Sequence, residues 1–293
     1  MMRGWLVVNA FTRSDKFLEL YDLLRDAAWQ EGVVLERKST MEVSPLVVEG
    51  QGAKEVPPFA LFWDKDVRLC RALELLGCRC FNGARPIELC DDKSATYLAL
   101  REAGLPQPAT LLAPKAFHPQ EWGHTEFPQV AAEVLGLPLV VKECFGSFGA
   151  QVHLGRSEDE VAAILDSLEG RPALCQSFVR SSSGRDVRLQ VVGKRVVAAM
   201  ERVSQTGDFR ANVTNGGVAR PWTPTEAQAE LALRACQALG LDFAGVDLLF
   251  GEDGEPLVCE VNSNAHFVNL GRATGVDVAR HIVRHVVDVC EGA

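Results

Sequence analysis

Residues 138–152 read PLVVKECFGSFGAQV, an apolar run followed by a lysine, a glycine-rich turn and the start of another apolar run. This spacing predicts a strand that delivers Lys142, a turn, and a return strand. Because glycine has no Cβ, backbone N–H groups near Gly146, Ser147 and Gly149 can approach phosphate oxygens closely, and Lys142 adds a positive charge. We therefore predict a nucleotide clamp. A glycine-rich hairpin with a surface lysine is the alternative, since the stretch matches neither the P-loop nor the dinucleotide-binding pattern.

A pair of apolar stretches near the C-terminus carries three side chains with oxygen donors. Asp247 lies in VDLLF (246–250), and Glu260 and Asn262 lie in LVCEVN (257–262), with a Glu-Asp-Gly turn between them. A hairpin places the three at neighbouring positions, and Glu260 and Asn262 share a face because strands have a period of two. Hard oxygen donors suit Mg²⁺ bound together with substrate phosphates. The alternative is an exposed hairpin with acidic edges.

Three arginines supply candidate contacts for negative charge. Arg188 and Arg202 fall in valine-rich strands, and Arg210 stands in GDFRAN (207–212). The planar guanidinium group matches the edges of phosphates and carboxylates, so these arginines are candidates for steadying an oxyanion during catalysis. For each of them, a surface salt bridge is the alternative.

The remaining pattern predicts an α/β protein with α+β subdomains in three segments, 1–92, 93–175 and 176–293. Strands expected at 4–10, 33–37 and 59–63 alternate with helices expected at 14–31 and 66–76, which predicts a mostly parallel sheet in the first segment. Asp92 is expected to cap a helix that begins near Lys93. The two later segments mix strands and helices as compact α+β units.

Composition excludes several classes of protein. The 293 residues carry 30 basic and 39 acidic side chains, a net charge of -9, which disfavours partners such as nucleic acid or anionic lipid. No apolar run approaches the ~20 residues of a membrane span, and the N-terminus does not read as a signal peptide. The nine cysteines include no Cys-x-x-Cys pair. These features predict a cytoplasmic protein with idle thiols.

Together, the three clusters resemble the ATP-grasp ligases, and among them the RimK-type alpha-L-glutamate (alpha-L-amino-acid) ligases. The resemblance begins at Asp92-Lys93 and runs to the C-terminal helix, and it implies an ATP-grasp fold preceded by an N-terminal α/β domain. It implies that Lys93 and Lys142 hold ATP phosphates under the loop of Gly146, Ser147 and Gly149, and that Arg210 and Asn212 contact the phosphates and the acyl phosphate. It also implies that Gln176, Ser177, Phe178 and Val179 line the adenine and that Asp186 contacts the nucleotide. The metal ligands that the resemblance implies are Asp247, Glu260 and Asn262.

The resemblance also implies the reaction and its partners. Such a ligase uses ATP and two Mg²⁺ ions, with Mn²⁺ as a substitute, to convert a carboxylate into an acyl phosphate that an amine then attacks, releasing ADP and phosphate. The expected partners are glutamate or another α-amino acid and a carboxylate on a peptide, a protein C-terminus or a metabolite. A homo-oligomer, a dimer or tetramer, is expected. The alternatives are a small-metabolite ligase of the glutathione-synthase or cofactor-tailing type and a non-catalytic nucleotide-binding module.

The chain departs from the RimK-type pattern after the metal strand. SNAHF (263–267) stands where these ligases commonly carry Ala-Ser-Pro-Gly. These positions border the acceptor pocket, which puts the ribosomal-protein substrate in doubt. His266 is a candidate substrate contact there, with a partly buried structural histidine as the alternative. The first ninety residues carry no motif of this family.

Overall fold

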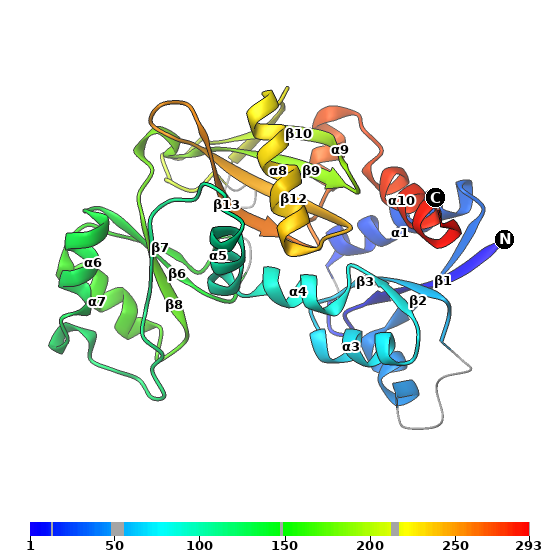
Figure 1. Cartoon of the computed structure of the whole chain (residues 1–293), viewed down its shortest axis with the longest axis horizontal. Helices are drawn as coiled ribbons and strands as arrows, with labels where there is room; N and C mark the ends of the chain where they lie inside the picture. Colours follow the sequence, from blue (N-terminus) through cyan, green and yellow to red (C-terminus); the bar gives the residue numbers. More distant parts are fainter. Residues whose placement is uncertain (13, 48–55, 147–148, 212–216, 293) are drawn as a thin grey trace.

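The computed structural model describes residues 1–12, 14–47, 56–146, 149–211 and 217–292, and Figure 1 shows their arrangement around three sheets. Ser147 and Asn212, both predicted site residues, lie outside this range. In the described ranges no helix combines the length and the apolar character needed to cross a bilayer.

The N-terminal sheet is parallel throughout, as the alternation of strands and helices predicts. Its order is β2-β1-β3-β4, formed by β1 (Met2–Val8), β2 (Val33–Ser39), β3 (Phe59–Trp63) and β4 (Arg79–Phe81). Alternate residues of β1 enter different cores: Leu6 and Val8 pack with α1 (Asp15–Gln30), and Trp5 and Val7 pack with α3 (Val67–Leu75). Because both faces are covered, every residue of β3 is buried. The first strand begins and ends two residues earlier than expected.

The central sheet is antiparallel and holds the glycine-rich turn. Its order is β5-β8-β6-β7, formed by β5 (Thr110–Leu112), β6 (Leu139–Glu143), β7 (Val152–Gly155) and β8 (Ala173–Ser177). The helices α6 (Phe127–Leu135) and α7 (Glu158–Ser167) pack on this sheet around one apolar core. β6 and β7 form the predicted hairpin, with Lys142 opposite Val152.

The C-terminal sheet is also antiparallel, in the order β11-β10-β9-β12-β13. It consists of β9 (Arg185–Val192), β10 (Arg195–Ser204), β11 (Gly217–Pro221), β12 (Phe243–Phe250) and β13 (Pro256–Asn262). One face packs on α8 (Glu226–Leu239), whose first turn carries a capping box from Thr225 and Gln228. The other face packs on α9 (Val268–Thr274) and α10 (Val278–Glu291). In Figure 1, α10 lies beside α1, so the first and last parts of the chain share a core.

Two helices join the N-terminal sheet to the central sheet. They are α4 (Ala84–Asp91), which was not among the expected elements, and α5 (Lys93–Glu102), which was. The Asp92 carboxylate caps α5 as predicted, accepting hydrogen bonds from the backbone N–H of Ser94 and Ala95. Leu100 of α5, which lies in the predicted segment 93–175, packs into the core of the C-terminal sheet. The strand β8 continues to Ser177, past the predicted boundary at 175. The segment boundaries at 92 and 175 stay predictions. The remaining short helices are α2 (Thr40–Val43), η1 (Ser44–Val47), η2 (Trp122–His124) and η3 (Arg180–Ser182).

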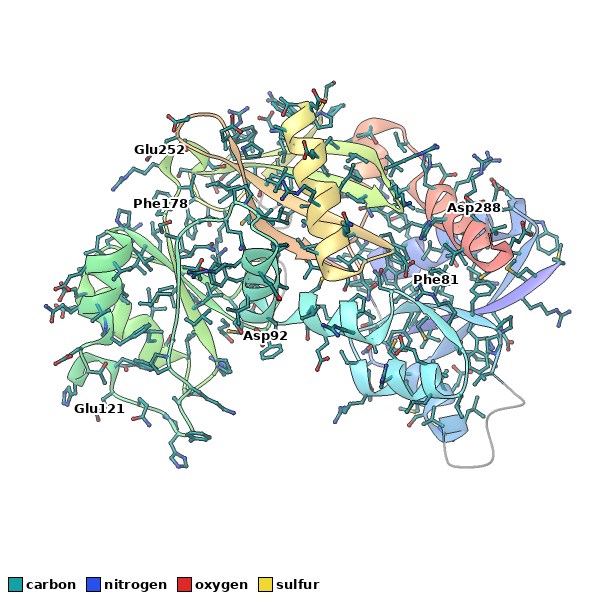
Figure 2. The ribbon with its side chains drawn as sticks, in the orientation of Figure 1. Phe81, Asp92, Glu121, Phe178, Glu252 and Asp288 are labelled. Atoms are coloured by element: carbon teal, nitrogen blue, oxygen red, sulfur yellow. The ribbon has the colours of Figure 1, made fainter. Side chains whose placement is uncertain are left out.

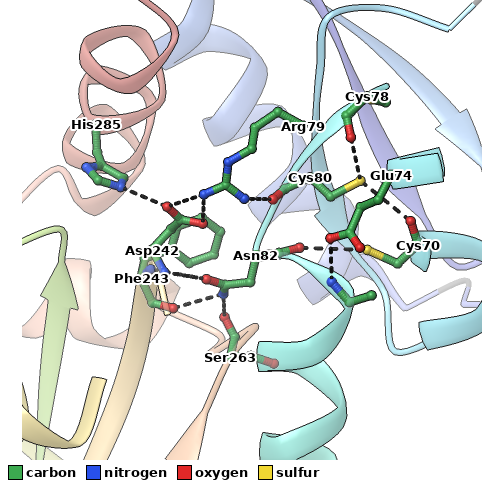
Figure 3. A network of polar contacts seen from close by, with 11 residues as sticks. Cys70, Glu74, Cys78, Arg79, Cys80, Asn82, Asp242, Phe243, Ser263 and His285 are labelled. Atoms are coloured by element: carbon green, nitrogen blue, oxygen red, sulfur yellow. Dashed lines mark hydrogen bonds and ion pairs between the residues drawn. The ribbon is translucent and has the colours of Figure 1, made fainter. Parts of the chain in front are cut away.

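A buried asparagine ties the N-terminal sheet to the C-terminal sheet (Figure 3). The side-chain amide of Asn82 donates to the carbonyls of Phe243 and Ser263 at 2.9 and 2.7 Å, and its oxygen accepts from the backbone of Asp242 at 2.8 Å. Phe243 begins β12, and Ser263 follows β13 directly. Asn82 therefore fixes both strands of the predicted metal hairpin relative to the N-terminal sheet.

Candidate active site

One cavity lies between the central and C-terminal sheets and collects the predicted nucleotide site. Its lining includes Lys93, Lys142, Gly146, Gly149, Gln176, Ser177, Phe178, Val179, Asp186, Arg202, Arg210, Asp247 and Glu260. Every predicted ATP-binding residue that the structure describes is in this set. Figure 2 shows Phe178 where the central sheet meets the C-terminal sheet. We call this space the first cavity.

Two lysines bring positive charge to the first cavity. Lys142 is buried at 8% exposure, and its Nζ donates to Gln176 Oε1 at 2.7 Å. No carboxylate of the described chain forms an ion pair with Lys142, so its charge is available for a ligand phosphate. Lys93 Nζ donates to the Gly146 carbonyl at 3.0 Å and lies 3.5 Å from Glu260 Oε1. Lys93 thus bridges the glycine turn and the predicted metal strand.

A buried ion network lies beside these lysines. Arg188 Nε and Nη2 each donate to Asp247 at 2.6 Å, and Arg202 Nε and Nη2 donate to Asp186 at 2.6 and 2.7 Å. Arg202 Nη2 also lies 3.0 Å from Asp247 Oδ2. Burial alone would raise the pKa of Asp247, but Arg188 and Arg202 outweigh it and hold that pKa below its usual range. The carboxylate of Asp247 is therefore held ionised.

The three predicted arginines all have carboxylate partners. In addition to the pairs of Arg188 and Arg202, Arg210 Nη2 pairs with Asp208 Oδ2 at 2.7 Å, and Arg210 Nη1 donates to the Gly149 carbonyl at 2.8 Å. Arg210 therefore joins the turn of the central sheet to the C-terminal unit across the first cavity. The alternative for each arginine was a surface salt bridge, but the pairs that Arg188 and Arg202 form are largely buried, and all three arginines line a cavity. A catalytic role for these arginines stays a prediction.

The predicted metal ligands stand on one hairpin. Asp247 is opposite Glu260 and Gly245 is opposite Asn262 in the register of β12 and β13, with a bulge after Asp247. Asp247 and Glu260 line the first cavity, whereas Asn262 does not. Across the described ranges, no three or more His, Cys, Asp or Glu side chains are gathered as a metal cluster. Two carboxylates and an amide oxygen still fit the chemistry of Mg²⁺, which takes its other ligands from phosphate and water. The metal assignment stays a prediction.

A second cavity, of about 390 Å³, lies between the N-terminal and C-terminal sheets. Arg202 and Glu260 line both cavities, so the two spaces adjoin at these side chains. The lining of the second cavity also includes Lys16, Glu19, Tyr21, Trp63, Asp64, Lys65, Arg188, Asn262, Asn264, His266 and Arg272. His266 Nε2 lies 2.9 Å from the Lys16 carbonyl, and burial lowers the pKa of its imidazole.

Sequence reasoning missed the N-terminal side of this second cavity. A usable signal was present: Asp64 and Lys65 follow directly on FALFW (59–63), a strand without a polar residue. In parallel sheets, polar residues at the carboxyl ends of buried strands lie where ligands bind. The WDK sequence (63–65) could therefore have been predicted as part of a site.

Comparison with known proteins decides the family. The model of the RimK-like ATP-grasp domain matches residues 90–286. The chain belongs to the RimK-like ATP-grasp family. The human beta-citrylglutamate synthase B is 37% identical over 219 residues, which cover 74% of this chain and 55% of that protein. The human N-acetylaspartylglutamate synthase A is 35% identical over 80% of this chain and 59% of its own length. The chain thus spans little more than half the length of these relatives.

A bacterial relative in this RimK-like family is covered more fully. The probable alpha-L-glutamate ligase of Enterobacter sp. is 38% identical over 73% of this chain and 69% of its own length. Among solved structures, the RimK domain protein ATP-grasp from Sphaerobacter thermophilus aligns with a TM-score of 0.70 at 24% identity, covering 97% of this chain and 99% of that one. The D-alanine–D-alanine ligase of Bacillus anthracis aligns with a TM-score of 0.75 at 16% identity, covering 100% and 99%. The predicted ATP-grasp fold, of mixed α/β content, is confirmed.

Proposed function

We propose that this RimK-like chain is an ATP-dependent carboxylate–amine ligase that releases ADP and joins glutamate or another α-amino acid to a carboxylate through an acyl phosphate. The observation that carries this proposal is the meeting of the two cavities at Arg202 and Glu260. A nucleotide in the first cavity and an amino acid or acid in the second would approach each other there. The names of the relatives support a glutamate-linked product.

In this proposal, the first cavity holds ATP. Lys93, Lys142 and Arg210 contact the phosphates together with the backbone of Gly146 and Gly149, since all five residues line the first cavity and the three side chains bring positive charge to it. The adenine lies against the segment of Gln176, Ser177, Phe178 and Val179, and Asp186 contacts the nucleotide. Asp247, Glu260 and Asn262 would hold two Mg²⁺ ions, which neutralise negative charge on the phosphates when bound.

The chemistry requires no protein nucleophile. A substrate carboxylate oxygen attacks the γ-phosphorus, the bond to ADP breaks, and the resulting acyl phosphate carries a good leaving group. The amine nitrogen then attacks the acyl carbon, loses a proton, and displaces phosphate. Arg202 lines both cavities and Arg188 lines the second, and a guanidinium group there can stabilise the negative oxygen of the tetrahedral intermediate.

An assay of ADP release tests this proposal. The purified chain is incubated with MgATP, each amino acid in turn and a panel of carboxylates, and the product is identified by mass. The expected result is ADP, phosphate and a new amide of matching mass. Formation of AMP and pyrophosphate from labelled ATP with every active pair would contradict the acyl-phosphate route. Nucleotide binding without ADP release for any pair would favour a non-catalytic module.

The volume of the second cavity suits a small-molecule substrate. Small molecules bind in concave sites of roughly 300 to 1,000 Å³, and a cavity of about 390 Å³ fits that range. We therefore place a small-metabolite ligase beside a peptide or protein ligase as the second candidate. The two differ in the product that the ADP-release assay identifies. Two metal ions, Mn²⁺ as a substitute, a homo-oligomer and a cytoplasmic location stay predictions.

A further inference from the structure

The imidazole of His266 is held in one tautomer in the wall of the second cavity. Its Nε2 lies 2.9 Å from the backbone carbonyl of Lys16, and its ring packs edge-on against the ring of Phe17, with the centroids 5.5 Å apart. A carbonyl oxygen only accepts hydrogen bonds, so Nε2 carries the proton and donates it to this bond. In the neutral ring, the free lone pair is therefore on Nδ1.

This second nitrogen of His266 is open to the cavity. In the part of the chain that the structure describes, the one hydrogen bond of the ring is the bond from Nε2. Unlike the unpaired nitrogen of Trp63, Nδ1 is not sealed from solvent. Because His266 lines the second cavity, a ligand there can reach a nitrogen that is ready to take a proton.

His266 also lies on the side of the second cavity that borders the first. A Cβ on Gly245 would lie 2.6 Å from the Cβ of Ala265 and 3.5 Å from Arg188 Cδ, so these two side chains pack over the same glycine. His266 follows Ala265 directly, and the charge of Arg188 acts on its imidazole. Arg188 in turn bonds to Asp247, which lines the first cavity. The imidazole is therefore near the place where the two substrates would meet.

The carboxylates of the described cavity lining are poorly placed to accept a proton there. Glu19 pairs with Arg272 at 2.6 Å. Glu260 is a predicted metal ligand and lies 3.5 Å from the ammonium group of Lys93. The unpaired oxygen of Asp64 is sealed from solvent.

The other titratable groups of this lining keep their protons at neutral pH. Burial is the main cause that raises the pKa of Tyr21 and of Cys90, each to about 12. Charged lysine and arginine side chains have no lone pair to offer. By contrast, burial lowers the pKa of His266, so its imidazole is neutral near pH 7 and can accept a proton.

We propose that His266 is the general base of amide formation. Its Nδ1 takes a proton from the substrate amine as the nitrogen attacks the acyl phosphate. The C–N bond forms, the bond between the acyl carbon and the phosphate oxygen breaks, and phosphate leaves with that electron pair. The imidazolium then releases its proton to water. This inference rests on the proposed function and extends it, because it assigns the proton transfer to one residue.

A comparison of two nucleophiles separates this role from that of a structural histidine. The chain is assayed with MgATP and a carboxylate that supports ADP release, and either the amino acid or hydroxylamine captures the acyl phosphate. Hydroxylamine is largely unprotonated at neutral pH and attacks an acyl phosphate without a base. We expect His266→Gln to slow amide formation at least about 100-fold and to keep hydroxamate formation within about twofold of the wild type.

The substitution to glutamine is chosen to keep the local structure. A glutamine amide can still donate to the Lys16 carbonyl, but it has no basic nitrogen. His281→Gln, at an exposed position of α10, is the matched control and should change neither product.

The pH dependence of kcat/KM for the amine gives a second measurement. The charged groups that face the imidazole are Lys16 and Glu19 of α1 and Arg188 of β9, and the two cations disfavour the protonated ring while Glu19 favours it. Below about pH 6.5, both the amine and His266 take up protons that block the reaction. The logarithm of kcat/KM should then fall with a slope of about two in the wild type and about one in His266→Gln.

The outcomes distinguish this inference from the proposed function. Wild-type rates of amide formation in folded His266→Gln would overturn the general base, and so would equal losses of amide and hydroxamate, which indicate a structural role. If this variant does not fold, a wild-type slope of about one would overturn it, and a slope of about two would support it. A wild-type chain that forms hydroxamate with no carboxylate would instead contradict the proposed function.

Discussion

Arg188 and Asp247 stand opposite each other on β9 and β12, and two hydrogen bonds of 2.6 Å join the guanidinium to the carboxylate. Arg202 approaches the same carboxylate from β10 at 3.0 Å. Asp247 thus neutralises two arginines inside the sheet. At the same time it is a predicted metal ligand, so one carboxylate would connect the arginines at the second cavity with the phosphates in the first.

Asp247→Asn is expected to lower the free energy of unfolding by about 3 kcal/mol, because it leaves two buried arginines without part of their countercharge. Urea denaturation followed by circular dichroism measures the change. Asp22→Asn removes a carboxylate whose side chain is 63% exposed and should change stability by less than about 0.5 kcal/mol. Equal unfolding midpoints for the two variants would show that the buried network contributes little.

Lys142→Met should weaken binding of a nonhydrolysable ATP analogue at least tenfold, since it removes the buried charge that no carboxylate of the described chain neutralises. Methionine keeps much of the volume of the side chain, so the fold should be retained. Fluorescence titration with a labelled nucleotide measures the affinity. Lys194→Met, on the exposed turn between β9 and β10, is the control. Undiminished affinity in Lys142→Met would remove this lysine from the phosphate site.

Much of this site was predictable from local sequence because the decisive residues sit on short hairpins. The pairing of Lys142 with Val152 and of Asp247 with Glu260 follows from an alternating pattern and a nearby turn. The cap of α5 by Asp92 follows from a local rule. Within such segments, register is set by the neighbouring residues alone.

Contacts between distant segments were not predictable in the same way. The partner of Arg188 is 59 residues away, and the Asn82 side chain bonds to a strand some 160 residues later. The helix α4 was missed because its Gly83 N-cap and the preceding Asn82 read as a turn. The second cavity is lined by residues of α1, of the end of β3 and of α9, which lie far apart in the sequence, so no local pattern encodes it.

Glu260→Gln combined with Asn262→Ala should abolish turnover and weaken Mn²⁺ binding in the presence of ADP, because it replaces one predicted carboxylate ligand by a neutral amide and removes the amide oxygen of another predicted ligand. Electron paramagnetic resonance of free Mn²⁺ gives the affinity without relying on activity. Glu252→Gln, in the exposed turn of the same hairpin (Figure 2), is the matched control. Wild-type Mn²⁺ affinity in the double variant would exclude Glu260 and Asn262 as ligands.

His266 should make stability depend on pH below neutrality. Burial lowers the pKa of its imidazole in the folded state, so the unfolded chain binds a proton more readily and stability falls as pH drops below the unfolded value of about 6.5. The hydrogen bond to the Lys16 carbonyl and the charge of Glu19 oppose this lowering of the pKa, and the charges of Lys16 and Arg188 add to it. Melting temperatures between pH 7.5 and 5.5 should fall more steeply for the wild type than for His266→Gln. Parallel curves would show that this histidine does not titrate differently on folding.

Asn82→Ala should lower the free energy of unfolding by at least about 3 kcal/mol, because it leaves buried backbone groups of Asp242, Phe243 and Ser263 without partners. The bonds in Figure 3 join the N-terminal sheet to both strands of the metal hairpin, so the variant should also raise the KM for the substrate in the second cavity more than the KM for ATP. Arg79→Ala removes a neighbouring ion pair whose arginine side chain is 47% exposed, and it should cost less than about 1 kcal/mol. Equal losses for the two variants in urea would show that the surface ion pair, rather than the buried amide, holds the two sheets together.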